Sequence, residues 1–339
     1  MKKRDHNKYF EFDDERSFSV KFCIHYFLAI LRNVFYKLLL LGAPKRERKD
    51  TKYQVTICGI FKNEAPFMKE WICFHQLLGV EHFYLYNNFS EDDYQQVLEP
   101  FIKEGCVTLM EWPVQQGQMS AYMDWYEKYR TETKWNIFLD LDEYICPRYE
   151  TNIYSWLKKY SKYPSVEVYW KMFGTAGQLD HDFNRLIIEQ YHVSWERYDN
   201  IGKVFYNTYF DISRFSRDMM HHFPCHFKRF GLTVSLIPVN EFGFFRHRNI
   251  NFVRDRFTIQ VNHYWSKAYG AYLGKQQRGY AVFETSPFNY DYFLYHEQKN
   301  KSSDYMIYRF LIPLKLKLGI NQKRDESIRL QNRQSSEDC

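Results

Sequence analysis

The residues best suited to chemistry lie in the segment 135–143, where two aspartates follow a run that suits a buried strand. If the strand alternation continues, Asp140 and Asp142 point to one side while Leu141 packs on the other. Two neighbouring carboxylates repel each other, and a cation beside them relieves that repulsion. A hard divalent ion that keeps several waters and also binds phosphates meets this need. We therefore predict an Asp-x-Asp site for a metal ion and a nucleotide diphosphate, with an acidic turn that merely ends the strand as the alternative.

Three strand–helix units precede this motif and must position it. We expect strands at 53–61, 82–86 and 107–110, each followed by a helix, and a fourth strand at 135–139. Pro66 lies near the start of the first helix, and Ser90 with Asp93 forms a capping box before the second. This alternation predicts an α/β fold with a mostly parallel sheet covered on both faces.

The carboxyl edge of such a sheet is where ligands bind. Asn63, Glu64 and Asn88 follow two successive strands, so a parallel sheet brings them together at that edge.

Several short blocks follow one another along the chain: Lys62-Asn63-Glu64-Ala65-Pro66, Leu78-Gly79-Val80-Glu81-His82-Phe83-Tyr84, Trp112-Pro113, Lys134-Trp135, Asp140-Leu141-Asp142-Glu143, Phe173-Gly174-Thr175-Ala176-Gly177 and Asn262-His263-Tyr264-Trp265-Ser266-Lys267. In this order and spacing they resemble family 92 glycosyltransferases and their bacterial family 2-like relatives. The resemblance covers roughly residues 53 to 280 and implies a GT-A-like fold that binds a nucleotide sugar. One block departs from the family, because its usual Asp-Asn-x-Ser is Asn87-Asn88-Phe89-Ser90 here. Asn87 can still form a hydrogen bond with a uracil edge.

The resemblance also assigns the site residues. Asn63, Glu64, Asn88 and Asp92 are expected to line the nucleotide pocket. Asp140 is expected near the ribose and the metal, and Asp142 directly on the metal. His263 is expected to complete the metal shell, with His222 in reserve, because a neutral imidazole suits Mn²⁺ and is acceptable for Mg²⁺.

An inverting transfer also needs a carboxylate base. Our candidate is Glu189, whose apolar neighbours would desolvate it and raise its pKa; Asp180 and Asp182 are nearby, and a charged residue on an exposed edge strand is the alternative. Lys267, Lys275 and Arg278 could neutralise the departing diphosphate, although such charges are more often a solvated helix face.

The N-terminal region carries most of the net charge. Residues 1–50 contain 12 Lys and Arg and 7 Asp and Glu, a net charge of +5 out of +6 for the chain. The body is therefore near neutral, which argues against a nucleic-acid binder. Within this region, Lys21, His25 and Arg32 share one face of an expected helix over 18–41, opposite an aromatic face. We expect this helix to lie in a membrane interface. A spanning helix, or a helix that packs on the enzyme or a second subunit, is the alternative.

The seven cysteines include no Cys-x-x-Cys pair, and the apolar stretch is preceded by acidic residues instead of a signal peptide. Both features favour a cytoplasmic enzyme at the inner face of the membrane. We expect three regions: a membrane-associating segment at 1–50, a GT-A-like domain at 51–320 and a polar tail at 321–339.

The predicted function is a metal-dependent glycosyltransferase, which moves a sugar from a UDP donor to a saccharide or glycolipid acceptor with inversion. Galactose is the sugar that the family resemblance suggests. A non-catalytic, membrane-attached sugar-binding protein is the alternative. A haloacid-dehalogenase-like phosphatase fits poorly, because its Asp-x-Asp would follow the first strand.

Overall fold

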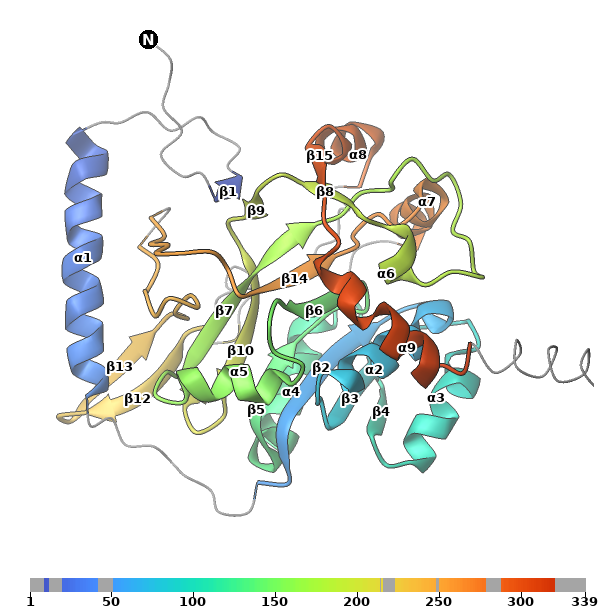
Figure 1. Cartoon of the computed structure of the whole chain (residues 1–339). Coiled ribbons are helices and arrows are strands. Elements are labelled where there is room, and N and C mark those ends of the chain that lie inside the picture. Colours follow the sequence, from blue (N-terminus) through green and yellow to red (C-terminus); the bar gives the residue numbers. More distant parts are fainter. Residues whose placement is uncertain are drawn as a thin grey trace, which may run out of the picture.

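An eight-stranded mixed sheet forms the centre of the molecule in a computed structural model that describes residues 9–11, 20–41, 51–213, 215, 223–247, 250–278 and 288–320 (Figure 1). In spatial order the strands are β4 (Val107–Glu111), β3 (His82–Asn87), β2 (Tyr53–Phe61), β5 (Thr133–Phe138), β10 (Gly202–Asn207), β7 (Ser165–Met172), β14 (Ile259–His263) and β6 (Glu143–Pro147). Strands β4, β3, β2 and β5 are parallel, and β7 and β14 run in the same direction. Only β10 and β6 oppose their neighbours in this sheet, so the sheet is mostly parallel as predicted.

Helices and three small sheets surround the central sheet. The helices of the body are α2 (Ala65–Leu77), α3 (Tyr94–Lys103), α4 (Gln118–Tyr129), α5 (Ile153–Leu157), α6 (Ile187–Gln190), α7 (Tyr269–Arg278), α8 (Tyr290–Glu297) and α9 (Leu311–Lys317). The small sheets pair β1 (Phe10–Glu11) with β9 (Tyr198–Asp199), β15 (Asn300–Ser303) with β8 (Val193–Trp195), and β11 (Asp211–Ile212) with β12 (Cys225–Arg229) and β13 (Leu232–Leu236). Figure 1 shows α2, α3 and α9 grouped together beside β2, β3 and β4.

The first half of the domain, from β2 to the end of β6 at Pro147, has its strands and helices in the predicted order. β2 buries every residue from Val55 to Phe61, because helices cover both faces of a parallel sheet. Gly59 in β2 lets the chain after β5 approach closely, since a Cβ there would lie 2.8 Å from the Leu139 carbonyl oxygen. β5 ends at Phe138, so the two aspartates lie in the turn that leads to β6 and not on the strand itself.

The predicted capping box before α3 is wrong. Asp93 is the N-cap residue of α3, but its side chain caps no backbone amide. The Ser90 hydroxyl instead accepts a hydrogen bond from the Asn63 amide at 2.9 Å. Ser90 is therefore used to join the loops that follow β2 and β3.

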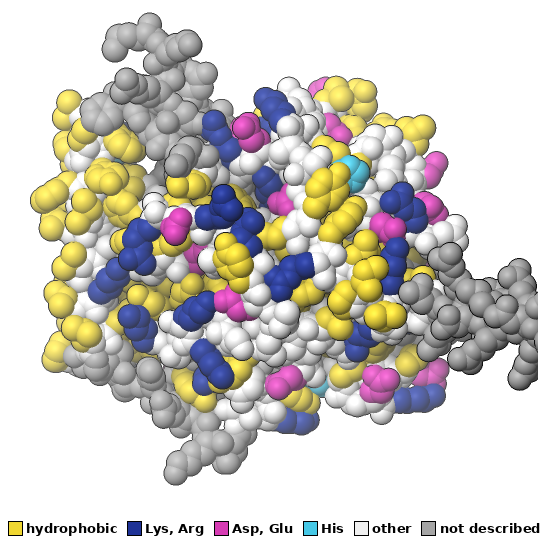
Figure 2. Space-filling model, in the orientation of Figure 1, with side chains coloured by type: hydrophobic (Ala, Val, Ile, Leu, Met, Phe, Trp, Pro, Cys, Tyr) yellow, Lys and Arg dark blue, Asp and Glu magenta, His cyan; other side chains and the backbone are white. Residues whose placement is uncertain are grey.

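Helix α1 (Val20–Leu40) runs along one edge of the body (Figure 1), and polar side chains make contacts with it. The Asn33 side-chain amide donates to the Phe245 carbonyl at 2.8 Å and accepts from the Phe245 amide at 2.6 Å, and Arg32 lies 3.3 Å from a ring nitrogen of His247. The opposite side carries exposed apolar residues, which gather along one edge of the molecule in Figure 2; they are Val20, Ile24, Phe27, Leu28, Leu31, Val34, Phe35 and Leu38. The helix thus packs on the enzyme, but with its polar face inward.

The structure describes part of the N-terminal region and none of the tail at 321–339. Residues 42–50 and 321–339 lie outside the described residues, so the boundaries predicted at 50 and 320 stay predictions. The six cysteines that the structure describes are free thiols, and four of them are buried.

Candidate active site

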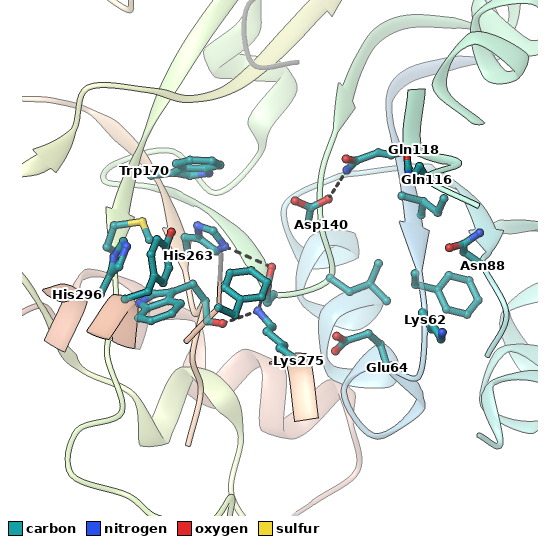
Figure 3. A pocket seen from close by; sticks show the side chains of 18 of the residues that line it. Lys62, Glu64, Asn88, Gln116, Gln118, Asp140, Trp170, His263, Lys275 and His296 are labelled. Atoms are coloured by element: carbon teal, nitrogen blue, oxygen red, sulfur yellow. Dashed lines mark hydrogen bonds and ion pairs between the residues drawn. The ribbon is translucent and has the colours of Figure 1, made fainter. Parts of the chain in front are cut away.

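A cavity of about 450 Å³ opens at the carboxyl ends of β2, β3, β7 and β14 (Figure 3). This volume suits a ligand of nucleotide-sugar size. Its residues from the first half of the domain are Ile60, Phe61, Lys62, Glu64, Asn88, Phe89, Gln115, Gln116, Gln118, Asp140, Leu141 and Asp142. Its residues from the second half are Trp170, Met172, Asp199, Ile201, His263, Trp265, Lys275, Phe288, Tyr292 and His296.

Three acidic residues of the cavity are each paired with a lysine from the second half. Lys203 Nζ lies 2.9 Å from Asp140 Oδ2, and it also lies 3.2 Å from the buried Glu143. Lys267 Nζ lies 2.8 Å from Glu64 Oε2, and Lys275 pairs with Asp142.

A lysine beside a buried carboxylate opposes the effect of burial, which raises the pKa of the carboxyl. For Glu143 burial still outweighs Lys203, and its pKa lies well above its usual range. Burial by itself would lower the pKa of Lys203, but Asp140 and Glu143 outweigh burial and raise it.

Asp142 is ionised although it is buried. Burial would raise the pKa of its carboxyl, but Lys275, His263 and Lys267 outweigh that effect and hold the pKa well below its usual range. His263 Nε2 lies 3.6 Å from Asp142 Oδ1, and burial lowers the pKa of His263 to about 4. The histidine is therefore a neutral imidazole at neutral pH, which is the form that binds metals.

These donors fit a divalent ion only in part. Within the described ranges, no three His, Cys, Asp or Glu side chains are grouped as a metal site. Asp140 turns to Lys203 and to Gln118 Nε2, which lies 3.4 Å away, so the predicted set of Asp140, Asp142 and His263 is not brought together (Figure 3). Asp142 and His263 remain as an anionic and a neutral ligand. A pair of protein ligands suffices for an ion that takes its other ligands from water and from substrate phosphates.

Two of the four predicted nucleotide residues outside the Asp-x-Asp motif reach the cavity. Glu64 and Asn88 line it, and the Asn88 side chain donates to the Trp112 and Val114 carbonyls at 2.8 and 2.9 Å. Asn63 and Asp92 do not line it. Asn63 accepts from the Glu91 amide at 2.8 Å, and Asp92 accepts from the Ala65 amide at 2.8 Å, where α2 begins. These two side chains therefore brace the loops around the site.

The substitution at Asn87 has a local explanation. Its side-chain amide donates to Glu111 Oε2 at 2.6 Å and to the Tyr94 hydroxyl at 2.8 Å, and Asn87 lies outside the lining of the cavity. An aspartate at this position would repel Glu111, so the asparagine suits its neighbours. The expected hydrogen bond from Asn87 to a uracil edge is not supported by this placement.

Glu189 lies away from the cavity. It belongs to the short helix α6 and not to an edge strand, and its Oε2 lies 2.9 Å from Lys315 Nζ. Asp180 and Asp182 are also absent from the lining. His222 and the Arg278 side chain lie outside the described residues.

The sequence interpretation missed several residues of the second half. Lys203 and Trp170 lie on strands, where an isolated lysine or tryptophan carries no pattern. Asp199 and the aromatic residues of α8 are also in the lining but follow no recognisable motif. Of the lysines expected near a diphosphate, Lys275 lines the cavity, whereas Lys267 is buried beneath it against Glu64.

The family follows from comparison with known proteins. A family model described as glycosyltransferase family 92 matches residues 51–273, which include the whole Asp-x-Asp turn and His263. The chain belongs to glycosyltransferase family 92. The predicted family and the predicted α/β class with a mostly parallel, GT-A-like sheet are thereby confirmed.

Known proteins match the chain over part of its length. A family 92 protein of Ricinus communis is 29% identical over 150 residues, which are 40% of this chain and 26% of that protein. The Arabidopsis thaliana galactan β-1,4-galactosyltransferase GALS3 is 31% identical over 132 residues, 34% of this chain and 26% of that protein. The match therefore spans about a quarter of the length of these relatives.

Among solved structures, Staphylococcus aureus TarS 1–349 in complex with UDP is 14% identical, with a TM-score of 0.32 over 46% of this chain and 47% of that one. The mannosyltransferase PcManGT of Pyrobaculum calidifontis, in complex with GDP-Man and Mn²⁺, is 14% identical, with a TM-score of 0.29 over 55% and 54%.

Proposed function

We propose that this family 92 protein is a metal-dependent glycosyltransferase that moves a hexose from a UDP donor to a saccharide acceptor with inversion. The observation that carries the proposal is the buried, ionised Asp142 beside neutral His263 in a cavity at the carboxyl edge of the sheet. A carboxylate that stays charged under burial is typical of a functional site.

The residues of the cavity have different roles in this proposal. Asp142 and His263 would hold the ion, which when bound supplies charge neutralisation for the leaving nucleoside diphosphate. Lys275 forms an ion pair with Asp142 and could bind a phosphate oxygen in place of that carboxylate, since both partners are anions. Glu64 and Asn88 lie at the ends of the loops after β2 and β3, where a nucleoside would be oriented by hydrogen bonds.

Galactose is the sugar that we propose for the donor. Two relatives are named galactan β-1,4-galactosyltransferases, and they match this chain with 31% and 29% identity. The acceptor is then a saccharide, either free or carried on a lipid.

A nucleotide-sugar panel tests the function. UDP-galactose with Mn²⁺ should raise the melting temperature of the full chain and be turned over slowly to UDP and sugar, and a chelator should abolish both effects. GDP-mannose and UDP-N-acetylglucosamine serve as matched donors. Stabilisation without any turnover would instead support the sugar-binding alternative, and the anomeric configuration of a transferred sugar, read by NMR, decides whether transfer inverts.

We also propose that α1 attaches the enzyme to the inner face of a cell membrane, with the body in the cytoplasm. By length and composition alone the helix could cross a membrane, but its polar side is occupied by the enzyme. The corrected orientation changes the mode of contact: the apolar side faces outward to lipid, while His25, Arg32 and Lys37 lie on the protein side. An in-plane helix whose apolar face is exposed binds the headgroup boundary.

Vesicle co-sedimentation tests this attachment. The full chain should pellet with anionic vesicles, and Leu31→Ser with Val34→Ser should weaken membrane binding by roughly 30-fold, since each lost apolar side chain costs about 1 kcal/mol of burial. Ile312→Ser is the control, because Ile312 is 60% exposed on α9, which lies on the other side of the body from α1 (Figure 1). Equal pelleting of all three proteins would show that α1 is only a packing element.

A further inference from the structure

The cavity has a second end that the metal and nucleotide do not account for. Figure 3 shows Trp170, His263 and His296 on one side of Asp140, whereas Asn88 and Lys62 lie on the other side. The first of these sides is formed by the second half of the domain and is largely aromatic. Its rings belong to Trp170, Trp265, Phe288, Tyr292 and His296.

These rings are fixed by one another. The ring centroids of Trp265 and His296 lie 4.6 Å apart, those of Tyr292 and His296 lie 4.3 Å apart, and those of Trp170 and His263 lie 4.8 Å apart. Trp265 and His296 are 4% and 7% exposed, so they are held in place by packing. A rigid aromatic surface loses little conformational entropy when a ligand stacks on it.

The chemistry of this surface fits a pyranose ring. One face of a sugar presents C–H bonds with partial positive charge, and the faces of aromatic rings are negative. The sugar hydroxyls need polar partners at the same place. Asp199, which also lines the cavity, can supply one.

A carboxylate lies beside the aromatic surface. Asp199 Oδ1 accepts the Ile201 amide at 3.2 Å, and the Ile201 carbonyl accepts the Trp170 amide at 3.1 Å. These bonds fix Asp199 next to Trp170, and both residues line the cavity that contains Asp142. Asp199 is therefore the carboxylate on the aromatic side, whereas Glu189 lies outside the cavity.

We propose that the aromatic end binds a pyranose of the saccharide acceptor and that Asp199 is the base for the transfer. The acceptor O–H bond breaks as its proton passes to a carboxylate oxygen of Asp199. The acceptor oxygen then forms a bond to the anomeric carbon, and the bond from that carbon to the diphosphate oxygen breaks, so that its electron pair leaves with UDP. This assignment rests on the proposed function and names its acceptor site.

Kinetics with UDP-galactose and β-1,4-linked galactotetraose test the assignment. Tyr292→Ala should raise the KM for galactotetraose by roughly tenfold, because the sugar loses one stacked ring. The affinity for UDP should stay within twofold of wild type. Tyr290→Ala is the matched control, because Tyr290 lies on the same helix but outside the lining and is 58% exposed. Trp170→Phe keeps an aromatic ring in a buried position and provides a second variant that should fold.

Asp199→Asn should lower the kcat for transfer by roughly 100-fold, which is within the usual range for loss of a general base. The KM for UDP-galactose should be unchanged. Asp199→Glu should recover part of that kcat. Equal loss of UDP affinity in these variants, or unchanged acceptor kinetics, would overturn the assignment.

Two outcomes separate this inference from the proposed function. If wild type binds and hydrolyses UDP-galactose but galactotetraose neither binds nor speeds UDP release, the acceptor class is wrong and the proposed function stands. If wild type neither binds nor hydrolyses any donor, the proposed function itself fails.

Discussion

The two halves of the domain bring opposite charges to one cavity. The first half, which ends with β6 at Pro147, supplies Glu64, Asp140 and Asp142. The second half supplies Lys203, Lys267 and Lys275. The paired residues are separated by 63, 133 and 203 positions in the chain. Neither half could bury its charges alone, because an unpaired charge in a low-dielectric interior is very costly. The site therefore forms only when both halves fold together.

A fourth acid of the first half makes an instructive contrast. Glu70 is buried, but its partners are the Ile187 and Ile188 amides at 2.9 and 3.2 Å instead of a paired cation. Burial raises the pKa of Glu70 to about 7 although these hydrogen bonds and Lys267 lower it. Backbone donors thus hold the side chain in place but leave it only partly ionised at pH 7.

The largest effect is expected where the charge serves the reaction. Asp142→Asn should reduce transfer by roughly 1,000-fold, about 4 kcal/mol, because the carboxylate that holds the ion loses its charge. The protein should stay folded, since asparagine is nearly isosteric. Asp182→Asn, in an exposed loop outside the cavity, is the control. Unchanged turnover in Asp142→Asn, measured as UDP release, would remove this residue from the site.

Loss of a lysine should instead affect stability. Lys203→Met leaves Asp140 and the buried Glu143 without their shared cation and should lower the free energy of unfolding by about 4 kcal/mol. Lys103→Met is the control, because the side chains of the Lys103–Glu99 pair are 73% and 60% exposed, and its loss should change stability by less than about 1 kcal/mol. Urea denaturation measures both variants. Similar decreases in the free energy of unfolding of the two variants would show that the buried pairs of Lys203 stabilise the fold no more than an exposed pair does.

The Glu70 contrast predicts a pH dependence of stability. The unfolded chain releases this proton near its usual pKa of about 4.3, and the folded chain holds it up to about pH 7. Between these values the folded state binds more protons, so the contribution of Glu70 to stability falls as the pH rises, by about 4 kcal/mol at most.

Glu70→Gln should therefore reduce the difference between the free energies of unfolding at pH 5 and pH 8, and the exposed Glu99→Gln should not. The comparison uses the pH difference within each variant, so a constant change in stability from the substitution does not matter. An unchanged difference in Glu70→Gln would show that the carboxyl is ionised throughout this range.

The smallest effect is expected at the nucleotide end. Glu64→Gln keeps a hydrogen-bond acceptor for Lys267. It should weaken UDP binding by about tenfold, because UDP loses one hydrogen bond to a charged group. Alanine is less suitable here, because it would leave the buried Lys267 without a partner. Calorimetry with Glu91→Gln as an exposed neighbouring control measures the change. Equal UDP affinity would assign Glu64 to the scaffold.

The sequence alone determined the strand–helix order of the first half. Strands at 53–61 and 82–87 and the helices after them follow from local periodicity and from the residues that begin and end each element. Since ligands bind at the carboxyl edge of a parallel sheet, Glu64, Asn88, Asp140 and Asp142 could be expected there, and all four line the cavity.

Only the tertiary structure decided which charges meet and which face is covered. The partner of Asp140 is Lys203, on an antiparallel strand that no local pattern places beside β5. Likewise, helical periodicity showed that α1 has a polar and an apolar face, but not that the polar face would dock on Phe245 and His247. Periodicity fixes the direction of a side chain relative to its own element, whereas its partner depends on long-range packing that the local sequence does not encode.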